Sequence, residues 1–564
     1  MHESDTEAAV SAVAPEAGQL AALDLAGFGD SLMAVAGRAA SRPADLAAAI
    51  GRFAQNLARI GPATAAAWLG ASAELPLPVT ADRRFADSAW SGNPFFAAVR
   101  QCHLAAGQLV SDVLAAGRGD PASDAKASLA ANFVLDALAP TNFLPTNPAA
   151  LKRAFETGGA SVLKGAGNFA SDLLTNRGMP RQVDKRPFAL GVNLAATPGK
   201  VVYANELMEL IQYAPQSDLV HAVPLLASPP WINKYYVMDL APGRSFIEWA
   251  VQHQRTVFAI SYRNPDASMR DVTLEDYLIG GPRRALDVVT DITGAPKTDI
   301  VGLCLGGALT AMLAAYLVAA GDDRLGSVSL LNTMLDYAEP GILGAFTDER
   351  TVARLERRMA ATGYLDGRQM AGAFDVIRAN DLIFSYVVSG WLMGQDPPTF
   401  DILAWNADST RMPAAMHAFY LRSLYIHNAL AKGDLTLAGE RLLLGDVKSD
   451  AYVVGAINDH IVPWHSSYQT TQLLGGDVRY VLSSGGHVAG IVNPPGPKAW
   501  HETAGDYPAG ADDWRTGASR ASGSWWQDWA DWAGKRAGPL TAPPPMGSEQ
   551  FPVVRDAPGQ YVRG

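Results

Sequence analysis

The stretch Gly302-Leu303-Cys304-Leu305-Gly306 says most about the fold of this protein. The residues that lead into it, Asp299-Ile300-Val301-Gly302-Leu303, have the apolar character of a buried strand, and residues 308–320 that of a helix. The glycines permit a sharp, strained turn between the two elements, which would place Cys304 at the helix N-terminus. There the helix dipole and free N–H groups favour a thiolate and stabilise an oxyanion. The pentapeptide therefore predicts a nucleophile elbow with sulfur in place of oxygen, although a buried structural cysteine would also fit it.

Two downstream segments supply the remaining members of a catalytic triad. The strand-like run Ala451–Ala456 leads into Asp459, so this carboxylate follows a strand end. The strand-like residues 478–482 precede a glycine-containing loop with His487 at its tip. Nucleophile, acid and histidine in this order are typical of α/β-hydrolases. We expect Asp459 to be the acid and His487 the base; His460 competes for the role of base, but beside Asp459 it would point differently.

An oxyanion formed at Cys304 would need two backbone N–H donors. One should come from Leu305, directly after the nucleophile, and the second from the loop after the strand-like residues 220–226. In that loop the candidates are Trp231 and Ile232.

Composition excludes several classes of function. The chain has 564 residues, enough for more than one domain. Its formal charge is 45 − 56 = −11, and it has no basic run. This charge argues against nucleic acid or an anionic membrane as partner. The two cysteines, Cys102 and Cys304, lie far apart, so neither a disulfide framework nor a metal site is expected. The N-terminus lacks the pattern of a secretory signal, and the longest apolar stretch, residues 308–320, is too short to span a bilayer. We therefore expect no transmembrane segment and a cytoplasmic location.

The sequence pattern changes along the chain in a way that predicts domains. Residues 1–25 suggest a mobile tail, residues 26–185 a mainly helical N-terminal domain, and residues 186–564 an α/β domain with a mainly parallel sheet. A largely helical stretch at about residues 335–445 lies between two strands and is interpreted as a cap over the cleft. The predicted strands are residues 220–226, 256–261, 299–303, 327–331, 451–456 and 478–482.

Three further features are given structural interpretations. Asn93-Pro94 predicts a helix cap followed by proline at the first helical position. Cys102, on the apolar face of the helix that follows, is expected in the core. Trp525, Trp526, Trp529 and Trp532 form a stripe at helical spacing, which favours core packing, and the proline-rich tail to Gly564 is expected to lie extended on the surface.

From about residue 80 onward, the chain resembles the polyhydroxyalkanoate synthases over nearly its whole length. The segments that carry the resemblance are Pro229-Pro230-Trp231-Ile232-Asn233-Lys234-Tyr235-Tyr236, Ser261-Tyr262-Arg263-Asn264-Pro265-Asp266, Gly302-Leu303-Cys304-Leu305-Gly306-Gly307, Asn380-Asp381-Leu382-Ile383, Phe400-Asp401-Ile402-Leu403-Ala404-Trp405-Asn406, Asp459-His460-Ile461-Val462-Pro463-Trp464, and Gly486-His487-Val488-Ala489-Gly490 with Asn493-Pro494-Pro495. A cysteine elbow alone is weakly specific, but the ordered set is strongly so.

The resemblance implies a helical N-terminal domain followed in the chain by a capped α/β-hydrolase domain. It also implies that the protein works as a homodimer. Such synthases polymerise (R)-3-hydroxyacyl-CoA, here expected to be 3-hydroxybutyryl-CoA, and release CoA through a Cys-bound acyl intermediate. They work in the cytoplasm at the surface of polyester granules, so the growing polyester chain is a further partner. No cofactor is expected beyond the CoA of the substrate, and no metal.

Two other functions fit parts of the sequence. A cysteine-dependent thioesterase or hydrolase would use the same triad, and product analysis would separate polymer from free acid. A non-catalytic granule-binding protein would keep only the fold. Asp459 could orient His487 or assist the substrate hydroxyl directly. Arg263 and Lys234 could contact CoA, although internal salt bridges explain them equally well.

Overall fold

The computed structural model describes residues 25–71, 75–78 and 82–564, so the predicted mobile tail, residues 1–25, lies outside the described residues except for its last position. The described residues form two compact units. The helical unit comprises those up to Asp184 together with Gln369–Thr399, and the sheet unit comprises Lys185–Arg368 and Phe400–Gly564. The predicted α/β fold with a helical N-terminal region is confirmed.

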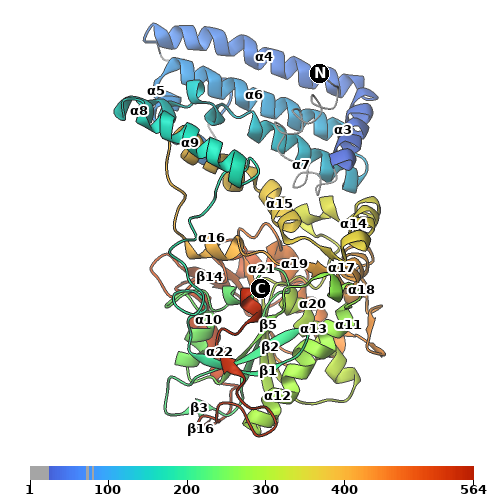
Figure 1. Cartoon of the computed structure of the whole chain (residues 1–564). Coiled ribbons are helices and arrows are strands. Elements are labelled where there is room, and N and C mark those ends of the chain that lie inside the picture. Colours follow the sequence, from blue (N-terminus) through green and yellow to red (C-terminus); the bar gives the residue numbers. More distant parts are fainter. Residues whose placement is uncertain (1–24, 72–74, 79–81) are drawn as a thin grey trace, which may run out of the picture. The chain divides into compact units, whose positions relative to one another are not determined.

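The helical unit is built from helices that pack side by side. Helix α4 packs against α6, and α3 packs against α7 (Figure 1). Its helices and 3-10 turns are α3 (Leu25–Ala40), α4 (Pro43–Trp68), η1 (Arg83–Phe85), α5 (Ala89–Gly92), α6 (Pro94–Ala116), α7 (Pro121–Ala137), η2 (Pro140–Asn142), η3 (Leu144–Thr146), α8 (Pro148–Glu156) and α9 (Ala160–Thr175). The predicted cap of α6 is confirmed, because the Asn93 side chain accepts a hydrogen bond from the N–H of Phe95 and Pro94 is the first helical residue.

The prediction that Cys102 lies in the core is wrong, because this residue is exposed. The buried side of α6 carries Ala97, Gln101 and Ala105, four residues apart. Since most residues of α6 are apolar, the pattern alone did not single out the face that packs against its neighbours.

The predicted cap, residues 335–445, is divided between the two units. Its middle part, Gln369–Thr399, belongs to the helical unit and contains most of α15 (Gly367–Ile377) together with the π-helical turns η8 (Asn380–Phe384) and η9 (Val387–Leu392). The Trp391 indole donates to the Asp172 carboxylate of α9 over 2.9 Å. At Gly165 a Cβ would lie 2.0 Å from the carbonyl oxygen of Trp391, so the missing side chain allows this segment to pack closely on α9. These contacts join residues about 220 positions apart, which sequence periodicity does not register.

The sheet unit contains a sheet that has, within the described residues, 11 strands in the order β15-β14-β13-β12-β7-β6-β4-β5-β2-β1-β17. The strands from β13 to β5 in that order are parallel, and the pairs at both edges are antiparallel. The bounds are β1 (Gly199–Ala204), β2 (Met208–Tyr213), β4 (Leu225–Ser228), β5 (Val257–Tyr262), β6 (Thr298–Leu303), β7 (Leu325–Leu331), β12 (Ala451–Ala456), β13 (Val478–Ser483), β14 (Trp500–Thr503), β15 (Ser519–Ser522) and β17 (Arg555–Asp556).

Five of the six predicted strands are confirmed within about two residues of their expected ends. Residues 220–226 instead form two elements, β3 (Val220–His221), which pairs with β16 (Leu540–Thr541), and β4 in the main sheet. Pro224 lies between them and has no N–H to donate to a ladder, which explains the interruption.

The antiparallel edge strands were not predicted. In β2, Glu209 and Gln212 are buried, although charged and amide side chains are depleted from strands. The Glu209 carboxylate accepts hydrogen bonds from the N–H groups of Gln560 and Tyr561, at 2.8 and 2.9 Å. Its partners therefore come from the end of the chain, and their distance in sequence hides the strand.

The helices of the sheet unit either flank the sheet or form the part of the predicted cap that belongs to this unit (Figure 1). They are α10 (Phe246–Gln252), α11 (Leu274–Leu278), η6 (Ile279–Arg283), α12 (Arg284–Thr293), α13 (Leu305–Ala319), α14 (Glu349–Thr362), α16 (Asp401–Asn406), α17 (Ala414–Tyr420), η10 (Leu421–Ile426), α18 (Ala429–Lys432), α19 (Trp464–Tyr468), α20 (Thr470–Leu473), α21 (Ala511–Gly517) and α22 (Trp525–Gly534). Helix α13 begins three residues before its predicted start and is buried over most of its length, as expected for a helix that is apolar all round.

The C-terminal part of the chain is packed into the fold. The predicted core position of the tryptophan stripe is confirmed: all four indoles of α22 are buried, and those of Trp525, Trp526 and Trp529 contact Phe246. The tail beyond α22 was expected to lie extended on the surface, but Phe551 and Val562 are buried. Strand β17, which pairs with β1, fixes the tail to one sheet edge.

Candidate active site

Cys304 occupies the turn between β6 and α13 with φ 52° and ψ −117°. A side chain in this region of backbone space is strained and persists only where the surrounding structure holds it. The N–H of Cys304 donates to the carbonyl oxygen of Leu331 at the end of β7, over 2.8 Å. The cysteine is partly exposed, so the fold does not bury this turn completely. This is the geometry that a nucleophile elbow requires.

Glycine at position 306 is required by the backbone of the neighbouring loop. A Cβ at Gly306 would lie 2.1 Å from the carbonyl oxygen of Ser228 and 2.5 Å from that of Pro229. Both belong to the segment that leads from β4 to Trp231, so the loop after β4 lies directly against the start of α13.

We expect Gly306→Ala to lower the free energy of unfolding by about 1–3 kcal/mol, the range for overpacked interiors, because backbone atoms must move to admit the methyl group. The same movement would displace the loop that carries Trp231 and Ile232. Urea unfolding followed by circular dichroism measures the first effect. Gly107→Ala in α6, where a Cβ meets nothing within 4 Å, is the matched control and should leave stability unchanged or raise it. Equal stability of the two variants would contradict the predicted clash.

His487 connects the acid and the nucleophile. Its Nδ1 lies 2.7 Å from Oδ2 of Asp459, whose side chain is 0% exposed, and its own side chain is 15% exposed. Cys304 lies close enough to His487 for its sulfur to affect the charge of the imidazole. Burial opposes the charged imidazolium, but the Asp459 carboxylate and the Cys304 sulfur outweigh it and raise the pKa of His487 well above 6.5. The three residues predicted as a triad are thus in contact, and this contact favours His487 over His460 as the base.

The second carboxylate oxygen of Asp459 is held by the backbone. Oδ1 accepts hydrogen bonds from the N–H groups of Ile461 and Val462, at 2.8 and 2.9 Å. The loops after β12 and β13 are also joined, since the N–H of Asn458 donates to the carbonyl oxygen of Gly485 over 2.9 Å. Asp459 is therefore fixed at both oxygens and directed at the His487 ring.

The residues predicted for the oxyanion hole lie in loops that meet at the elbow. Leu305 is the first residue of α13, where N–H groups have no partner in the preceding turn. In the described part of the chain, no acceptor takes a hydrogen bond from the N–H of Leu305, Trp231 or Ile232. The N–H of the next residue, Asn233, donates to Oγ1 of Thr410 over 2.7 Å, which anchors the loop. These free N–H groups are of the kind that a developing oxyanion needs.

Buried tyrosines of the cap lie near the nucleophile. Tyr420 donates a hydrogen bond to the phenol oxygen of Tyr425 over 3.3 Å, and Tyr337 packs edge-on against Tyr425. Burial, then the neighbouring phenols, then the charge of Cys304 raise the pKa of Tyr337 and of Tyr420 well above 10. Trp231 packs edge-on against Tyr420 with ring centroids 5.8 Å apart. The cap thus brings neutral phenols to the region of Cys304, and the loop after β4 brings an indole.

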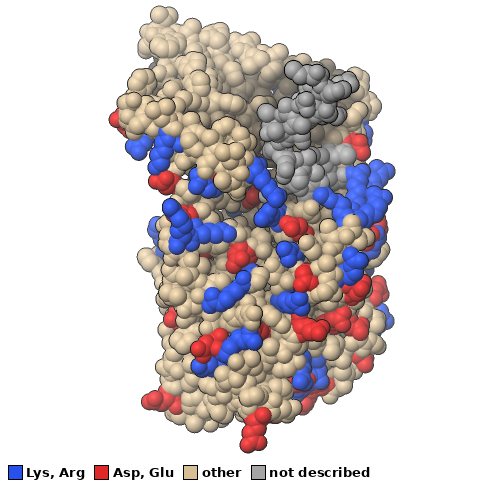
Figure 2. Space-filling model, in the orientation of Figure 1, with Lys and Arg blue, Asp and Glu red and all other residues tan. Residues whose placement is uncertain are grey.

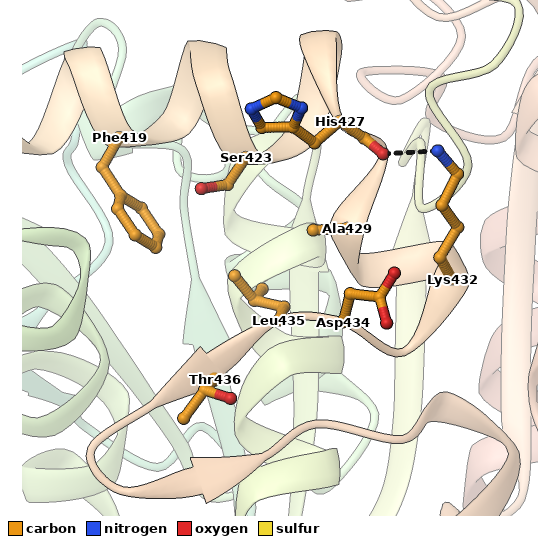
Figure 3. Close-up of a pocket in the computed structure, with 8 residues that line it drawn as sticks. All are labelled: Phe419, Ser423, His427, Ala429, Lys432, Asp434, Leu435 and Thr436. Atoms are coloured by element: carbon orange, nitrogen blue, oxygen red, sulfur yellow. Dashed lines mark hydrogen bonds between the residues drawn. The ribbon is translucent and has the colours of Figure 1, made fainter.

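A separate pocket of about 530 Å³ opens beside the same helical segment (Figure 3). Figure 3 shows Phe419, Ser423 and His427 above the pocket and the strand segment with Leu435 and Thr436 below it. The Lys432 ammonium group donates to the carbonyl oxygen of His427 over 2.7 Å. None of the predicted triad residues lines this pocket.

Sequence reasoning missed several residues that support the triad. The indole N–H groups of Trp525 and Trp526 donate to the carbonyl oxygens of Gly490 and Ile491, each over 2.8 Å, and so hold the loop that carries His487. The sequence did contain a signal for these contacts: a tryptophan expected in the core has an indole N–H that needs a hydrogen-bond acceptor.

The two basic residues considered as CoA contacts are engaged within the protein. The Arg263 guanidinium pairs with Asp266 at 2.6 Å. Lys234 is buried, and its ammonium group donates to the carbonyl oxygens of Val562 and Gly564 at the end of the chain, at 2.8 and 2.5 Å. Both therefore serve the fold.

Among residues 25–71, 75–78 and 82–564, no cluster of three or more His, Cys, Asp or Glu side chains could hold a metal ion. No helix in the described part of the chain is both long and apolar enough to cross a bilayer.

Comparison with known proteins gives consistent matches along most of the chain. Residues 81–250 match the family described as poly-beta-hydroxybutyrate polymerase N-terminus, and residues 220–494 match the α/β hydrolase fold. A poly(3-hydroxyalkanoate) polymerase from Methylorubrum extorquens is 40% identical over 91% of this chain and 86% of its own length. The poly(3-hydroxyalkanoate) polymerase subunit PhaC of Rhizobium meliloti is 41% identical over 86% of this chain and 79% of its own.

Among solved structures, a hydrolase from Pseudomonas aeruginosa aligns with 52% of this chain and 94% of its own, at 16% identity and a TM-score of 0.29. At this TM-score it supports no inference about activity.

Proposed function

Because this chain belongs to the poly(3-hydroxyalkanoate) polymerase family of acyltransferases, we propose that it joins (R)-3-hydroxyacyl groups from CoA thioesters into polyester through an acyl group carried on Cys304. The observation that carries the proposal is the contact chain from Asp459 through His487 to Cys304 at a strained elbow. No cofactor takes part other than the CoA of the substrate.

The first step transfers the acyl group from CoA to Cys304. The proton of Cys304 rests on His487, and the thiolate attacks the thioester carbonyl. The oxyanion is held by the N–H of Leu305 and by that of Trp231 or Ile232, each worth about 3 kcal/mol. The carbon–sulfur bond to CoA then breaks, and the CoA sulfur takes the proton from His487.

Chain growth uses a hydroxyl group as the second nucleophile. The 3-hydroxyl of another hydroxyacyl thioester attacks the carbonyl bound to Cys304, its proton passes to His487, and the Cys304 sulfur departs. The exchange of one thioester for another is nearly isoenergetic, while ester formation from a thioester runs downhill, so sulfur keeps the acyl group activated until it reaches a hydroxyl.

We assign Asp459 to orienting His487 rather than to acting on the substrate. Its Oδ2 contacts the imidazole, and its Oδ1 already accepts two backbone hydrogen bonds. A substrate hydroxyl would have to compete with these backbone N–H groups or with His487 for an oxygen of Asp459. The contact between Oδ2 and the imidazole is the one expected of a carboxylate that stabilises imidazolium.

Polymerisation also requires that water be kept from the acyl-enzyme. Tyr337, Tyr420 and Tyr425 are at least half buried and lie close enough to Cys304 to feel its charge. Their rings and the Trp231 indole bring aromatic surface to the region of the sulfur, which disfavours water there. This packing favours polymerase over hydrolase chemistry.

The first test incubates purified protein with (R)-3-hydroxybutyryl-CoA. Free CoA is followed with a thiol reagent, and the pellet is examined for polyester. We expect CoA release together with insoluble polymer. Release with only soluble 3-hydroxybutyrate would overturn the proposal and establish the thioesterase alternative. A parallel incubation with (R)-3-hydroxyoctanoyl-CoA tests the preference for short acyl groups, which predicts slower release from the longer substrate.

Association with the polyester surface is supported by apolar side chains on the helical unit. Trp68 at the end of α4 is 64% exposed, and on α8 and α9 Phe155, Leu163 and Leu174 are 84%, 78% and 85% exposed. On the face shown in Figure 2, the surface over α4 and α6 carries few charged residues. An apolar polyester is a suitable partner for such a surface. The same incubation tests this point, because a granule-bound enzyme sediments with its product. We also propose that the protein works as a homodimer, and its mass in solution tests this.

A further inference from the structure

Asn332 is a buried polar residue at the end of β7, beside the nucleophile elbow. It is 0% exposed, and its φ of 43° lies in the left-handed region, which asparagine tolerates better than most residues. It belongs to none of the motifs by which the sequence suggested a catalytic site. A buried amide in this conformation calls for an explanation in terms of its contacts.

The backbone and side chain of Asn332 connect the three elements that carry the triad. The preceding residue, Leu331, accepts the hydrogen bond from the N–H of Cys304 over 2.8 Å. The N–H of Asn332 donates to the carbonyl oxygen of Val454 in β12, the strand before Asp459, also over 2.8 Å. Its side-chain Nδ2 donates to the carbonyl oxygen of His487 over 2.6 Å. Nucleophile, acid strand and histidine loop therefore meet at the consecutive residues Leu331 and Asn332, and Asn332 makes the contacts to the acid strand and the histidine loop.

The side chain keeps this contact at a cost. With Nδ2 directed at a carbonyl oxygen, Oδ1 of Asn332 is buried and accepts no hydrogen bond from any residue in the described part of the chain. A buried unpaired acceptor destabilises the folded protein, and an apolar side chain of similar size would avoid this cost. The cost is explained if the donor half of the amide is needed where it lies.

The loop that carries His487 needs such an anchor. Gly485, with φ 111°, and Gly486 precede the histidine, and their carbonyl oxygens accept hydrogen bonds from the N–H groups of Asn458 and Gly490, at 2.9 and 2.6 Å, so the loop is held on this side up to the residue before His487. On the other side, the indole of Trp525 holds the carbonyl oxygen of Gly490. Asp459 fixes the rotation of the imidazole through Nδ1, but it does not fix the main chain of His487. Among the described residues, the one hydrogen bond to the carbonyl oxygen of His487 comes from Asn332.

We infer that Asn332 is a positioning residue, which holds the main chain of His487 at the distance from Cys304 that proton transfer requires. The inference rests on the proposed roles of Cys304 and His487. Displacement of a catalytic group by about 1 Å can cost about 100-fold in rate, so a single anchoring hydrogen bond is sufficient to matter.

The test uses Asn332→Gly, which keeps the left-handed backbone and removes the donor. Alkylation of Cys304 by iodoacetamide, read on its own peptide by mass spectrometry, reports the contact with His487 without any acyl-CoA. Asp459 and Cys304 are the charged groups that face His487. The pH at which alkylation reaches half of its maximal rate should therefore depend on how His487 lies between them. We expect alkylation at pH 7 to fall about tenfold and its midpoint to move to higher pH. With acyl-CoA, kcat should fall by about 10- to 100-fold and KM by less than about threefold.

Asn205→Gly is the matched control. Its side-chain Nδ2 likewise donates to a main-chain carbonyl oxygen, that of Gly280, over 2.9 Å, but it lies at the β1–β2 hairpin, with β5 and β4 between it and β6. This variant should lose stability without a change in Cys304 alkylation. If Asn332→Gly does not fold, Asn332→Asp keeps the shape and, when ionised, cannot donate; its kcat should fall while KM holds.

Alkylation at the wild-type rate and midpoint in a folded Asn332 variant would overturn the inference and leave the proposed function intact. Absence of CoA release by the wild type would overturn the proposed function, and this outcome is read independently of alkylation.

Discussion

Replacement of Cys304 by alanine is expected to abolish CoA release from (R)-3-hydroxybutyryl-CoA while the protein remains folded. The methyl group cannot form an acyl bond, and removal of a triad nucleophile costs about 10⁶-fold in kcat. The fold should persist because the turn is held by backbone contacts, including the hydrogen bond from the N–H of residue 304 to Leu331. Free CoA is measured with a thiol reagent, and thermal unfolding confirms the folded state.

Cys102→Ala is the control for this experiment. Cys102 is the other cysteine of the chain. It is exposed on α6 of the helical unit, so its replacement should leave CoA release unchanged. Residual release by folded Cys304→Ala at more than about 1% of the wild-type rate would show that another group is the nucleophile, because the expected loss is about 10⁶-fold. Equal loss in both variants would point to a general effect of thiol removal.

Asp459→Asn is expected to lower kcat by about 10⁴-fold, the loss found when a triad aspartate becomes an amide. The amide cannot stabilise imidazolium, and it can present its NH₂ group to Nδ1 of His487, which favours the wrong tautomer. The Oδ1 position still accepts hydrogen bonds from the N–H groups of Ile461 and Val462, so the loop should keep its shape. Steady-state CoA release gives kcat, and thermal unfolding gives the stability.

The same substitution has a predicted effect on pH dependence. Asp459 raises the pKa of His487, which favours a protonated imidazole beside the Cys304 sulfur. Without the carboxylate charge the pKa of His487 falls, and the sulfur loses the positive charge that favours its reaction with an alkylating reagent. The pH midpoint of Cys304 alkylation by iodoacetamide should therefore move to higher pH in Asp459→Asn.

Asp512→Asn provides a matched aspartate–histidine pair. Its carboxylate lies 3.0 Å from Nε2 of His465 on the surface of the sheet unit. Exposed pairs contribute at most about 1 kcal/mol, so this variant should retain CoA release and the wild-type alkylation profile. Should Asp459→Asn behave like Asp512→Asn, the assignment of Asp459 to the triad fails.

The parts of the site that the sequence predicted are those encoded by short local patterns. Cys304 was found because a strand, two glycines and a helix follow one another within about twenty residues. Asp459 and His487 were found because each follows an apolar run that ends at a loop. In a parallel sheet the carboxyl ends of neighbouring strands share one edge, so strand order brings such loops together.

The parts that the sequence did not predict depend on partners that are remote in the chain. The division of the predicted cap follows from contacts of Trp391 with α9, and the burial of Glu209 in β2 follows from the last residues of the tail. Cys102 was misplaced because α6 is apolar on more than one face, and only the helices that pack against it decide which face is buried.

The sequence by itself thus determined the fold class, the order of the candidate triad and its placement at strand ends, because these follow from hydrophobic periodicity and from the turn chemistry of glycine. Only the tertiary structure decided which main-chain groups hold the triad together. Asn332 reaches His487 across 155 positions, and Trp525 reaches Gly490 across 35. Such contacts exist only once the sheet has assembled, since a side-chain amide or indole pairs with whatever carbonyl the packing brings to it.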